Sequence, residues 1–377
     1  MMNYETAYNK YKKKFIYKNL PTQKLKFKKH IYNYFFIIPV YNEFPIIMDT
    51  LQSINNQQKE LLKKTLVVLV INNSTDTDSQ IIKNNLQTHT NVRIKKYNYE
   101  CISLDYYSSK KAITKSKFGV GIARKIGMDF ILKYSTKSSL ILSLDADTII
   151  SKKYLLTIVN YYSKKKFGAC TVNFKHQKHN DDIINQGIQI YENELYHIAS
   201  QIKKSKSPYG YVSMGSAMIC TVEAYIAIGG MCQRRAAEDF YFLQALAKYT
   251  KIHNISKVLV FPSSRSEQRV HLGTGYRMNE YKNTKQFKNL FFSNKSYQLI
   301  KELILLVDKN YKQPYSILNK ELNKYFDYNI CNFLSIHKLN NIWDKINYNA
   351  KSKKQFMLFF HQWFDALKIM QLLKLIN

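Results

Sequence analysis

Cysteine, acidic side chains and long apolar runs are scarce in this chain of 377 residues. Its five cysteines form no Cys-x-x-Cys pair and are odd in number. That count argues against a zinc or disulfide framework and for reduced thiols. No apolar run reaches the roughly 18 residues that a transmembrane helix needs. Residues 1–20 are polar and rich in lysine, so we expect no signal peptide and a cytoplasmic location.

The shortage of acids leaves a large positive charge, since 58 lysines and arginines face 26 acids and give a net charge of +32. This charge favours polyanions, anionic lipid headgroups or phosphorylated substrates as partners. The abundance of Lys, Asn, Ile and Tyr is also typical of an AT-rich genome, so part of the charge has a mutational explanation. The basic residues are spread out, and we expect no specific nucleic-acid binding.

Apolar runs alternate with helical patterns, which predicts an α/β fold with a mostly parallel sheet covered by helices on both faces. Continuous apolar runs predict buried strands at 34–40, 65–71, 140–144, 169–174, 216–220 and 257–261, with a short strand at 92–94. Helical spacing predicts helices at 121–132, 151–162, 184–198, 222–228 and from residue 238. We expect a basic lead-in at 1–34, a main domain at 35–280 and a helical extension at 281–377.

The pair Asp145-Ala-Asp147 directly follows the predicted strand at 140–144. Two carboxylates at the end of a buried strand are costly unless a positive charge lies beside them. Oxygen ligands of this kind suit Mg²⁺ or Mn²⁺ carrying a phosphorylated ligand. The alternative is a pair of solvated turn carboxylates, or caps for the next helix.

A second acidic pair, Glu238-Asp239, opens a predicted helix about ninety residues later. A carboxylate there is suited to deprotonate a hydroxyl nucleophile. The alternative is that both acids complement the helix dipole. Just upstream, Arg235 is either a surface charge or a group that neutralises a leaving diphosphate.

Two weaker signals point to phosphate or metal. The segment from Gly119 to Arg124 lacks the third glycine of a dinucleotide fingerprint, but Arg124 is a candidate phosphate ligand. His271 lies in a loop with Arg265 and Arg269 and is a candidate metal ligand, although a lone histidine is more often structural.

Five segments, in order over residues 35–275, resemble motifs of bacterial family 2 glycosyltransferases, which have the GT-A fold. They are Ile38-Pro39-Val40-Tyr41-Asn42-Glu43, Gly121-Ile-Ala-Arg124-Lys-Ile-Gly127, Asp145-Ala-Asp147, Gly215-Ser-Ala-Met-Ile and Glu238-Asp239. The resemblance does not cover residues 1–34 and reaches the C-terminal region only loosely. It implies an inverting, metal-dependent transfer of a sugar from a nucleoside diphosphate sugar to an acceptor hydroxyl, in cell-envelope or capsule polysaccharide synthesis.

The resemblance also implies roles for single residues. Asp147 would hold Mn²⁺ or Mg²⁺, with Asp145 and His271 as further metal candidates and Asp145 also reaching the ribose. Asp239 would be the general base, with Glu238 beside it. The nucleotide would be lined by Pro39, Tyr41, Glu43, Asn73, Arg124 and Arg235.

One departure concerns the nucleotide base, because many members carry an aspartate pair where this chain has Asn72-Asn73. An amide both accepts and donates hydrogen bonds, so a UDP-sugar is favoured as donor and not secured. The acceptor would be a glycan or a lipid-linked sugar. The alternatives are a sugar nucleotidyltransferase and a non-catalytic, polyanion-binding protein with a degenerate transferase fold.

The last predicted helix carries an apolar face from Phe356 to Leu373. This face either packs on the main domain or inserts into the cytoplasmic leaflet, helped by nearby lysines. The second option would make the protein peripheral on the inner face of the plasma membrane, in contact with its anionic surface.

Overall fold

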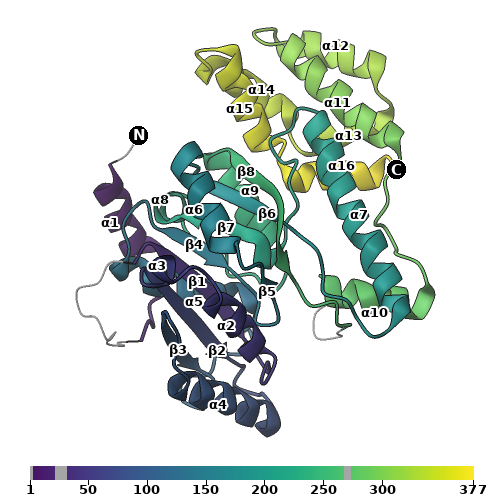
Figure 1. The fold of residues 1–377 in the computed structure, drawn as a ribbon. Coiled ribbons are helices and arrows are strands. Elements are labelled where there is room, and N and C mark those ends of the chain that lie inside the picture. The colour runs from purple at the N-terminus through teal and green to yellow at the C-terminus, as the bar shows by residue number, and fades with distance from the viewer. Residues whose placement is uncertain (1–2, 22–31, 267–272) are drawn as a thin grey trace. The chain divides into compact units, whose positions relative to one another are not determined.

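A computed structural model describes residues 3–21, 32–266 and 273–377, and the chain divides into two compact units (Figure 1). The first unit comprises Met1–Gln189 and Ser213–Lys285, and the second comprises Ile190–Val212 and Gln286–Asn377. The domain boundaries expected at residues 34 and 280 stay predictions.

The first unit is built on a sheet with the strand order β3-β2-β1-β4-β7-β6-β8-β5. The strands are β1 (Tyr34–Val40), β2 (Thr65–Asn72), β3 (Glu100–Tyr106), β4 (Leu140–Ser143), β5 (Ile149–Ile150), β6 (Ala169–Phe174), β7 (Met218–Thr221) and β8 (Ile252–Phe261). Pairing is parallel from β3 through β4 and between β6 and β8, whereas β7 and β5 run antiparallel to their neighbours. The predicted α/β fold with a mostly parallel sheet is confirmed.

Helices pack around this sheet. They are α1 (Tyr4–Lys14), α2 (Ile47–Asn55), α3 (Lys59–Leu62), α4 (Ser79–Ile94), α5 (Val120–Phe130), α6 (Tyr154–Lys165), α8 (Val222–Ala227), α9 (Glu238–Tyr249) and α10 (Thr274–Thr284), with short 3₁₀ turns at Ile131–Tyr134 and Gly215–Ala217. Helix α5 lies on β1 and β2. Gly127 permits this contact, since a Cβ there would lie 2.6 Å from the side chain of Ile37.

The short strand predicted at 92–94 is wrong, because these residues form the last turn of α4. Asp78 caps this helix by accepting a hydrogen bond from the backbone N–H of Gln80, at 2.7 Å. Its buried positions Asn85, Thr88 and Val92 follow helical spacing. The third strand in chain order is β3, which the sequence analysis missed.

The N-terminal helix α1 belongs to the first unit and packs on α8. Its Tyr11 is buried and donates a hydrogen bond from its hydroxyl to Asp129 Oδ1, at 2.5 Å. Lys125 Nζ lies 3.0 Å from both that hydroxyl and Asp129 Oδ2. Because Lys125 and Asp129 are on α5, helix α1 is fixed to α5 through buried polar contacts.

The second unit is helical, as predicted for the C-terminal region. Helix α7 (Asp182–Lys204) runs from the first unit into it, and the others are α11 (Asn294–Lys309), α12 (Tyr315–Tyr325), α13 (Tyr328–Ile336), α14 (Leu339–Asn349), α15 (Lys353–Trp363) and α16 (Ala366–Leu375). The single last helix that we predicted is wrong. Asp365 starts a new helix by accepting a hydrogen bond from the backbone N–H of Lys368, at 3.2 Å.

The apolar face of α15 and α16 is packed inside the second unit. Phe356, Phe360 and Phe364 are fully buried, and the rings of Phe356 and Trp343 lie edge to face at 5.3 Å. In this structure the buried part of this face contacts other helices of the second unit. Across the described residues, no helix combines the length and the apolar character needed to span a membrane.

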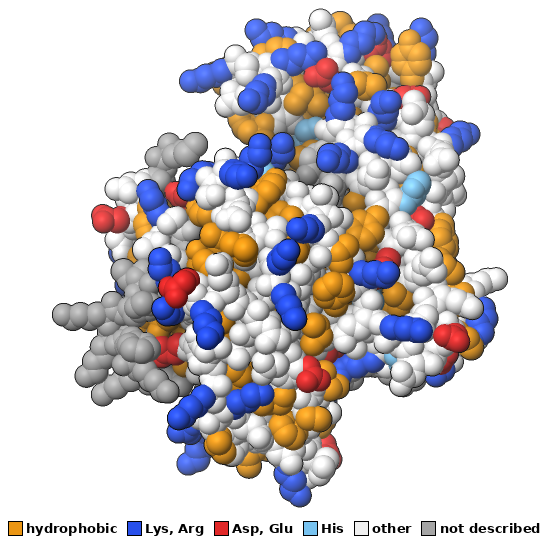
Figure 2. All heavy atoms as spheres, viewed as in Figure 1, with side chains coloured by type: hydrophobic (Ala, Val, Ile, Leu, Met, Phe, Trp, Pro, Cys, Tyr) orange, Lys and Arg blue, Asp and Glu red, His pale blue; other side chains and the backbone are white. Residues whose placement is uncertain are grey.

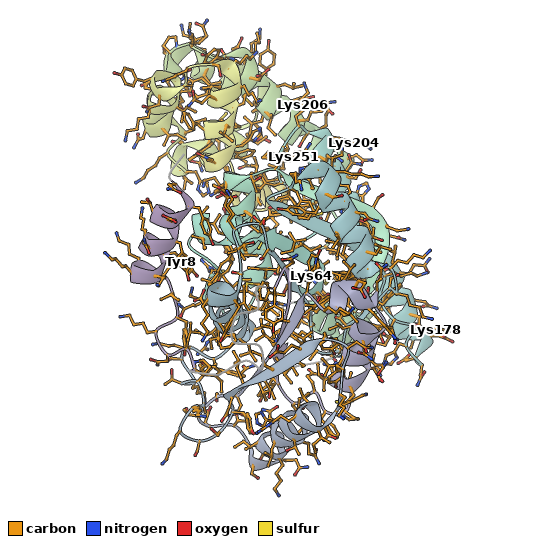
Figure 3. The ribbon with its side chains drawn as sticks, turned by 60° about the vertical axis from the view of Figure 1, so that its left-hand side comes forward. Tyr8, Lys64, Lys178, Lys204, Lys206 and Lys251 are labelled. Atoms are coloured by element: carbon orange, nitrogen blue, oxygen red, sulfur yellow. The ribbon has the colours of Figure 1, made fainter. Side chains whose placement is uncertain are left out.

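Lysine and arginine side chains are scattered over the face drawn in Figure 2. In Figure 3, Lys64, Lys178 and Lys251 of the first unit lie well apart. On the face drawn, the basic side chains form no concentrated stripe. All five cysteines are free thiols.

Candidate active site

Several of the predicted site residues lie on loops at one edge of the sheet. Strand β1 pairs in parallel with β2 and with β4, so the carboxyl ends of the three strands meet at this edge. Ligands of open α/β sheets bind at such edges. Tyr41 and Glu43 follow β1, Asn73 follows β2, and Asp145-Ala-Asp147 follows β4.

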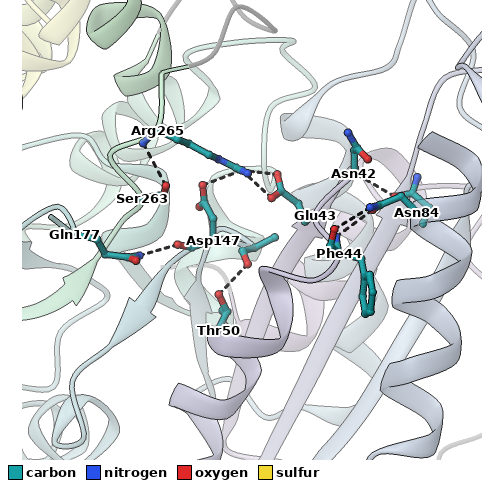
Figure 4. Close-up of polar contacts among 11 residues, drawn as sticks. Asn42, Glu43, Phe44, Thr50, Asn84, Asp147, Gln177, Ser263 and Arg265 are labelled. Carbon is teal, nitrogen blue, oxygen red and sulfur yellow. Dashed lines mark hydrogen bonds and ion pairs between the residues drawn. The ribbon is translucent and has the colours of Figure 1, made fainter. Parts of the chain in front are cut away.

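The loop that carries the two aspartates is held through its backbone (Figure 4). Thr50 of α2 donates its hydroxyl to the carbonyl of Ala146 at 2.8 Å, and the side-chain amide of Gln177 donates to the carbonyl of Asp147 at 2.9 Å. One of these donors precedes the loop in the sequence and the other follows it. Because both hold the loop backbone, the fold sets the positions of the two carboxylates. Nothing in the sequence analysis identified Thr50 or Gln177.

Asp147 shares an arginine with Glu43 (Figure 4). Arg265 Nη2 lies 2.7 Å from each carboxylate oxygen of Glu43 and 2.9 Å from Asp147 Oδ2. Burial raises the pKa of Asp147 to about 7, and the positive charge of Arg265 opposes that rise. In the sequence, Arg265 stands out only as a neighbour of His271. Its pairing with an acid more than two hundred residues away carries no sequence signal.

Asp145 shares a different arginine with Glu238. The buried guanidinium of Arg124 donates from Nη2 to Asp145 and from Nη1 to Glu238. Burial raises the pKa of Glu238 to about 7, and Arg124 opposes this rise. The structure thus brings the two acidic motifs together around one side chain. The observed partners of Arg124 are carboxylates, and its role as a phosphate ligand stays a prediction.

The N-terminus of α5 lies against the segment that precedes α9. A Cβ at Gly121 would lie 2.4 Å from the carbonyl oxygen of Arg234, so only glycine fits this approach. Arg235 is exposed and donates from Nη2 to the carbonyl of Lys115, at 2.7 Å. This contact places Arg235 beside the start of α5, and its proposed contact with a diphosphate stays a prediction.

Asp239 lies in the first turn of α9, next to Glu238. Its Oδ1 accepts a hydrogen bond from the backbone N–H of Phe240, at 2.8 Å. Burial raises the pKa of Asp239, and Arg124 opposes the rise. A carboxylate with a raised pKa is a better proton acceptor than an ordinary one, which is what a general base needs.

Two asparagines of α4 hold the loops that were predicted to line the nucleotide. Asn85 donates to the side-chain oxygen of Asn73 at 3.1 Å and accepts from the backbone N–H of Asn42 at 3.0 Å. Asn84 makes two hydrogen bonds with the backbone of Phe44, at 2.8 and 3.0 Å (Figure 4). Because Asn73 is buried and accepts a hydrogen bond from Asn85, its side chain stabilises the loop in this structure.

The remaining predicted residues are placed as follows. The ring of Tyr41 is half-buried and lies 5.2 Å from that of Phe118. Pro39 is inside β1, opposite Val70 of β2, and is partly exposed. His271 lies outside the described residues. Within residues 3–21, 32–266 and 273–377, no three or more His, Cys, Asp or Glu side chains gather as a metal site.

The comparisons with known proteins identify the class. The family model for glycosyl transferase family 2 matches residues 35–225, just over half of the chain. The chain therefore belongs to the family 2 glycosyltransferases, and the predicted membership is confirmed. No curated protein matches the chain by sequence.

Among the solved structures that match the chain are S. aureus TarS and the mannosyltransferase PcManGT. S. aureus TarS in complex with UDP-GlcNAc is 16% identical, with a TM-score of 0.42 over 90% of this chain and 81% of that one. The mannosyltransferase PcManGT from Pyrobaculum calidifontis, in complex with GDP-Man and Mn²⁺, is 15% identical, with a TM-score of 0.41 over 96% and 94%. Membership of the family follows from the family model.

Proposed function

We propose that this glycosyltransferase moves a sugar from a nucleoside diphosphate sugar to an acceptor hydroxyl in a single displacement, with inversion at the anomeric carbon. The observation that carries the proposal is the buried guanidinium of Arg124, which holds Asp145 and Glu238 together. It joins the end of β4, where a donor would bind, to the start of α9, where Asp239 is available as a base.

In the proposed reaction, Asp239 removes the proton of the acceptor hydroxyl as its oxygen attacks the anomeric carbon. The bond from that carbon to the diphosphate breaks, and the nucleoside diphosphate leaves with the electron pair. The raised pKa of Asp239 supports its role as the proton acceptor. Arg124 keeps Glu238 and Asp145 in place while the charge moves from the hydroxyl to the diphosphate.

The donor set fits a divalent cation, because Mg²⁺ and Mn²⁺ use one or two carboxylates together with substrate phosphates. Asp147 would hold it, with Asp145 nearby. Glu43 and Asp147 already share the cationic side chain of Arg265, and this supports the assignment of a cation to Asp147. When bound, the metal would supply charge stabilisation for the diphosphate. Several points stay predictions. They are metal binding by His271, the preference for UDP, the polysaccharide pathway, the identity of the acceptor, and contact with the inner face of a membrane.

The test is a panel of nucleotide sugars with Mn²⁺ or Mg²⁺, which measures donor binding and release of nucleoside diphosphate. Asp239→Asn should bind the donor normally but lose roughly 10²–10⁴-fold in turnover, because its base is gone. Asp147→Asn should weaken donor binding. The control is Asp344→Asn, which changes an exposed aspartate of α14 and should leave both quantities unchanged. Absence of donor binding with either metal would favour a degenerate, non-catalytic fold.

A further inference from the structure

Arg265 holds two carboxylates from different parts of the chain. Its Nη2 contacts both oxygens of Glu43 and one oxygen of Asp147, within 2.9 Å. Glu43 follows β1, Asp147 follows β4, and Arg265 follows β8, so the sheet itself brings the three together. Figure 4 shows the guanidinium reaching between the two acids. The structure therefore already places a positive group on the carboxylate that the proposed function assigns to a metal.

This contact compensates two acids that are largely withdrawn from water. The side chains of Glu43 and Asp147 are 9% and 18% exposed, whereas that of Arg265 is 26% exposed. Two neighbouring carboxylates repel each other in such surroundings unless a cation lies between them. The guanidinium supplies that charge in the structure as it stands.

The backbone of Arg265 is held separately from its side chain. Its N–H donates to Ser263 Oγ at 3.3 Å, in the segment that leaves β8 (Figure 4). This backbone contact does not involve the guanidinium, so the long side chain can change its rotamer while the main chain stays in place. Exchange of the guanidinium for another cation would require no rearrangement of the sheet.

We propose that Arg265 is a built-in counter-ion that competes with a divalent cation for Asp147. The inference rests on the proposed function, because it takes Asp147 as the metal-binding carboxylate. The Asp147 oxygen that accepts from Arg265 is engaged while the ion pair exists. Metal binding then becomes favourable when a nucleoside diphosphate supplies negative charge that attracts the guanidinium away. Metal and nucleotide therefore strengthen each other's binding.

The test measures Mn²⁺ binding to the full chain from the paramagnetic resonance signal of free Mn²⁺, with and without UDP. Arg265→Met should bind Mn²⁺ about tenfold more tightly than the wild type without UDP, and UDP should add less. Arg265→Gln is a second, polar variant with the same expected direction. The matched control is Arg277→Met, which removes an arginine paired with Glu280 on α10 and should bind Mn²⁺ like the wild type.

Three outcomes would overturn the inference. One is that both Arg265 variants, shown to be folded by circular dichroism, bind Mn²⁺ no tighter than the wild type. Another is that the gain persists when Asp147→Asn is added to Arg265→Met, because the metal would then be elsewhere. The third is that no form binds Mn²⁺ even with UDP. Each leaves donor turnover and its loss in Asp239→Asn to be judged separately, so failure here is distinguishable from failure of the proposed function.

Discussion

Two arginines divide the aspartates of Asp145-Ala-Asp147 between them, in different surroundings. Arg124 is 2% exposed and joins Asp145 to Glu238. Arg265 is 26% exposed and joins Asp147 to Glu43. Both contacts pair one guanidinium with two carboxylates, so the difference lies in the access of water.

The difference in exposure indicates which arginine is part of the framework and which is exchangeable. Removing one partner of a buried ion pair leaves an uncompensated charge and is strongly destabilising. Where water reaches the group, solvent and dissolved ions replace part of the lost interaction. Arg124 therefore fixes the distance between the two acidic motifs. Arg265 is the exchangeable counter-ion of Asp147.

Of the substitutions at the two arginines, Arg124→Leu should cost the most stability. We expect a loss of about 3–5 kcal/mol in the free energy of unfolding, since Glu238 and Asp145 lose their shared buried cation. Activity should fall with it, because the two acidic motifs are no longer joined. The measurement is denaturation in urea followed by circular dichroism. The comparison fails if Arg265→Met costs as much.

A smaller effect is expected from Gly215→Ala, which tests the placement of Arg124 without removing its charge. A Cβ at this position would lie 2.3 Å from Arg124 Nη2, so the guanidinium must shift. Overpacking of this kind costs about 2 kcal/mol. Unfolding in urea measures it, with Ser213→Ala on the same segment as control. A neutral Gly215→Ala would show that Arg124 has more freedom than its burial indicates.

Arg265→Met should be milder, at about 1–2 kcal/mol, because both of its partners keep some access to water. The sign of its pH dependence follows from Asp147, whose pKa burial raises to about 7 against the opposing Arg265. Without Arg265 that pKa should rise further. The measurement is unfolding at pH 5 and pH 8, and the loss should be larger at pH 8. Equal losses at both values would contradict this account.

Much of the fold was predictable, because a strand buried on both faces consists of apolar residues throughout. Strands β1 and β6 have the predicted bounds. Strand β3 was missed because its buried and partly exposed residues are mixed, so it lacks a continuous apolar run. Strands buried on both faces were therefore predictable from the sequence, whereas a strand with mixed exposure was not.

The candidate site was predictable only in part. Acids at strand ends are visible in the sequence, since a strand ends where its apolar run ends. The pairing of Glu43 with Arg265 depends on where β8 lies in the sheet, which single-chain patterns do not encode. The same holds for Tyr11, which lies in the predicted basic, partly helical lead-in and is buried against α5.

Tyr11→Phe tests whether the stability of α5, the helix that carries Arg124, depends on its contacts with α1. The substitution removes the hydroxyl that donates to Asp129 and keeps the ring. Asp129 retains Lys125 and the hydroxyl of Tyr225, at 3.0 and 2.7 Å, so we expect a loss of only about 1 kcal/mol. The matched control is Tyr8→Phe on the same helix, drawn in Figure 3. If Tyr11→Phe lowers stability but Tyr8→Phe does not, the framework around Arg124 extends to the N-terminal helix; equal effects would confine it to α5 and the segments around α9.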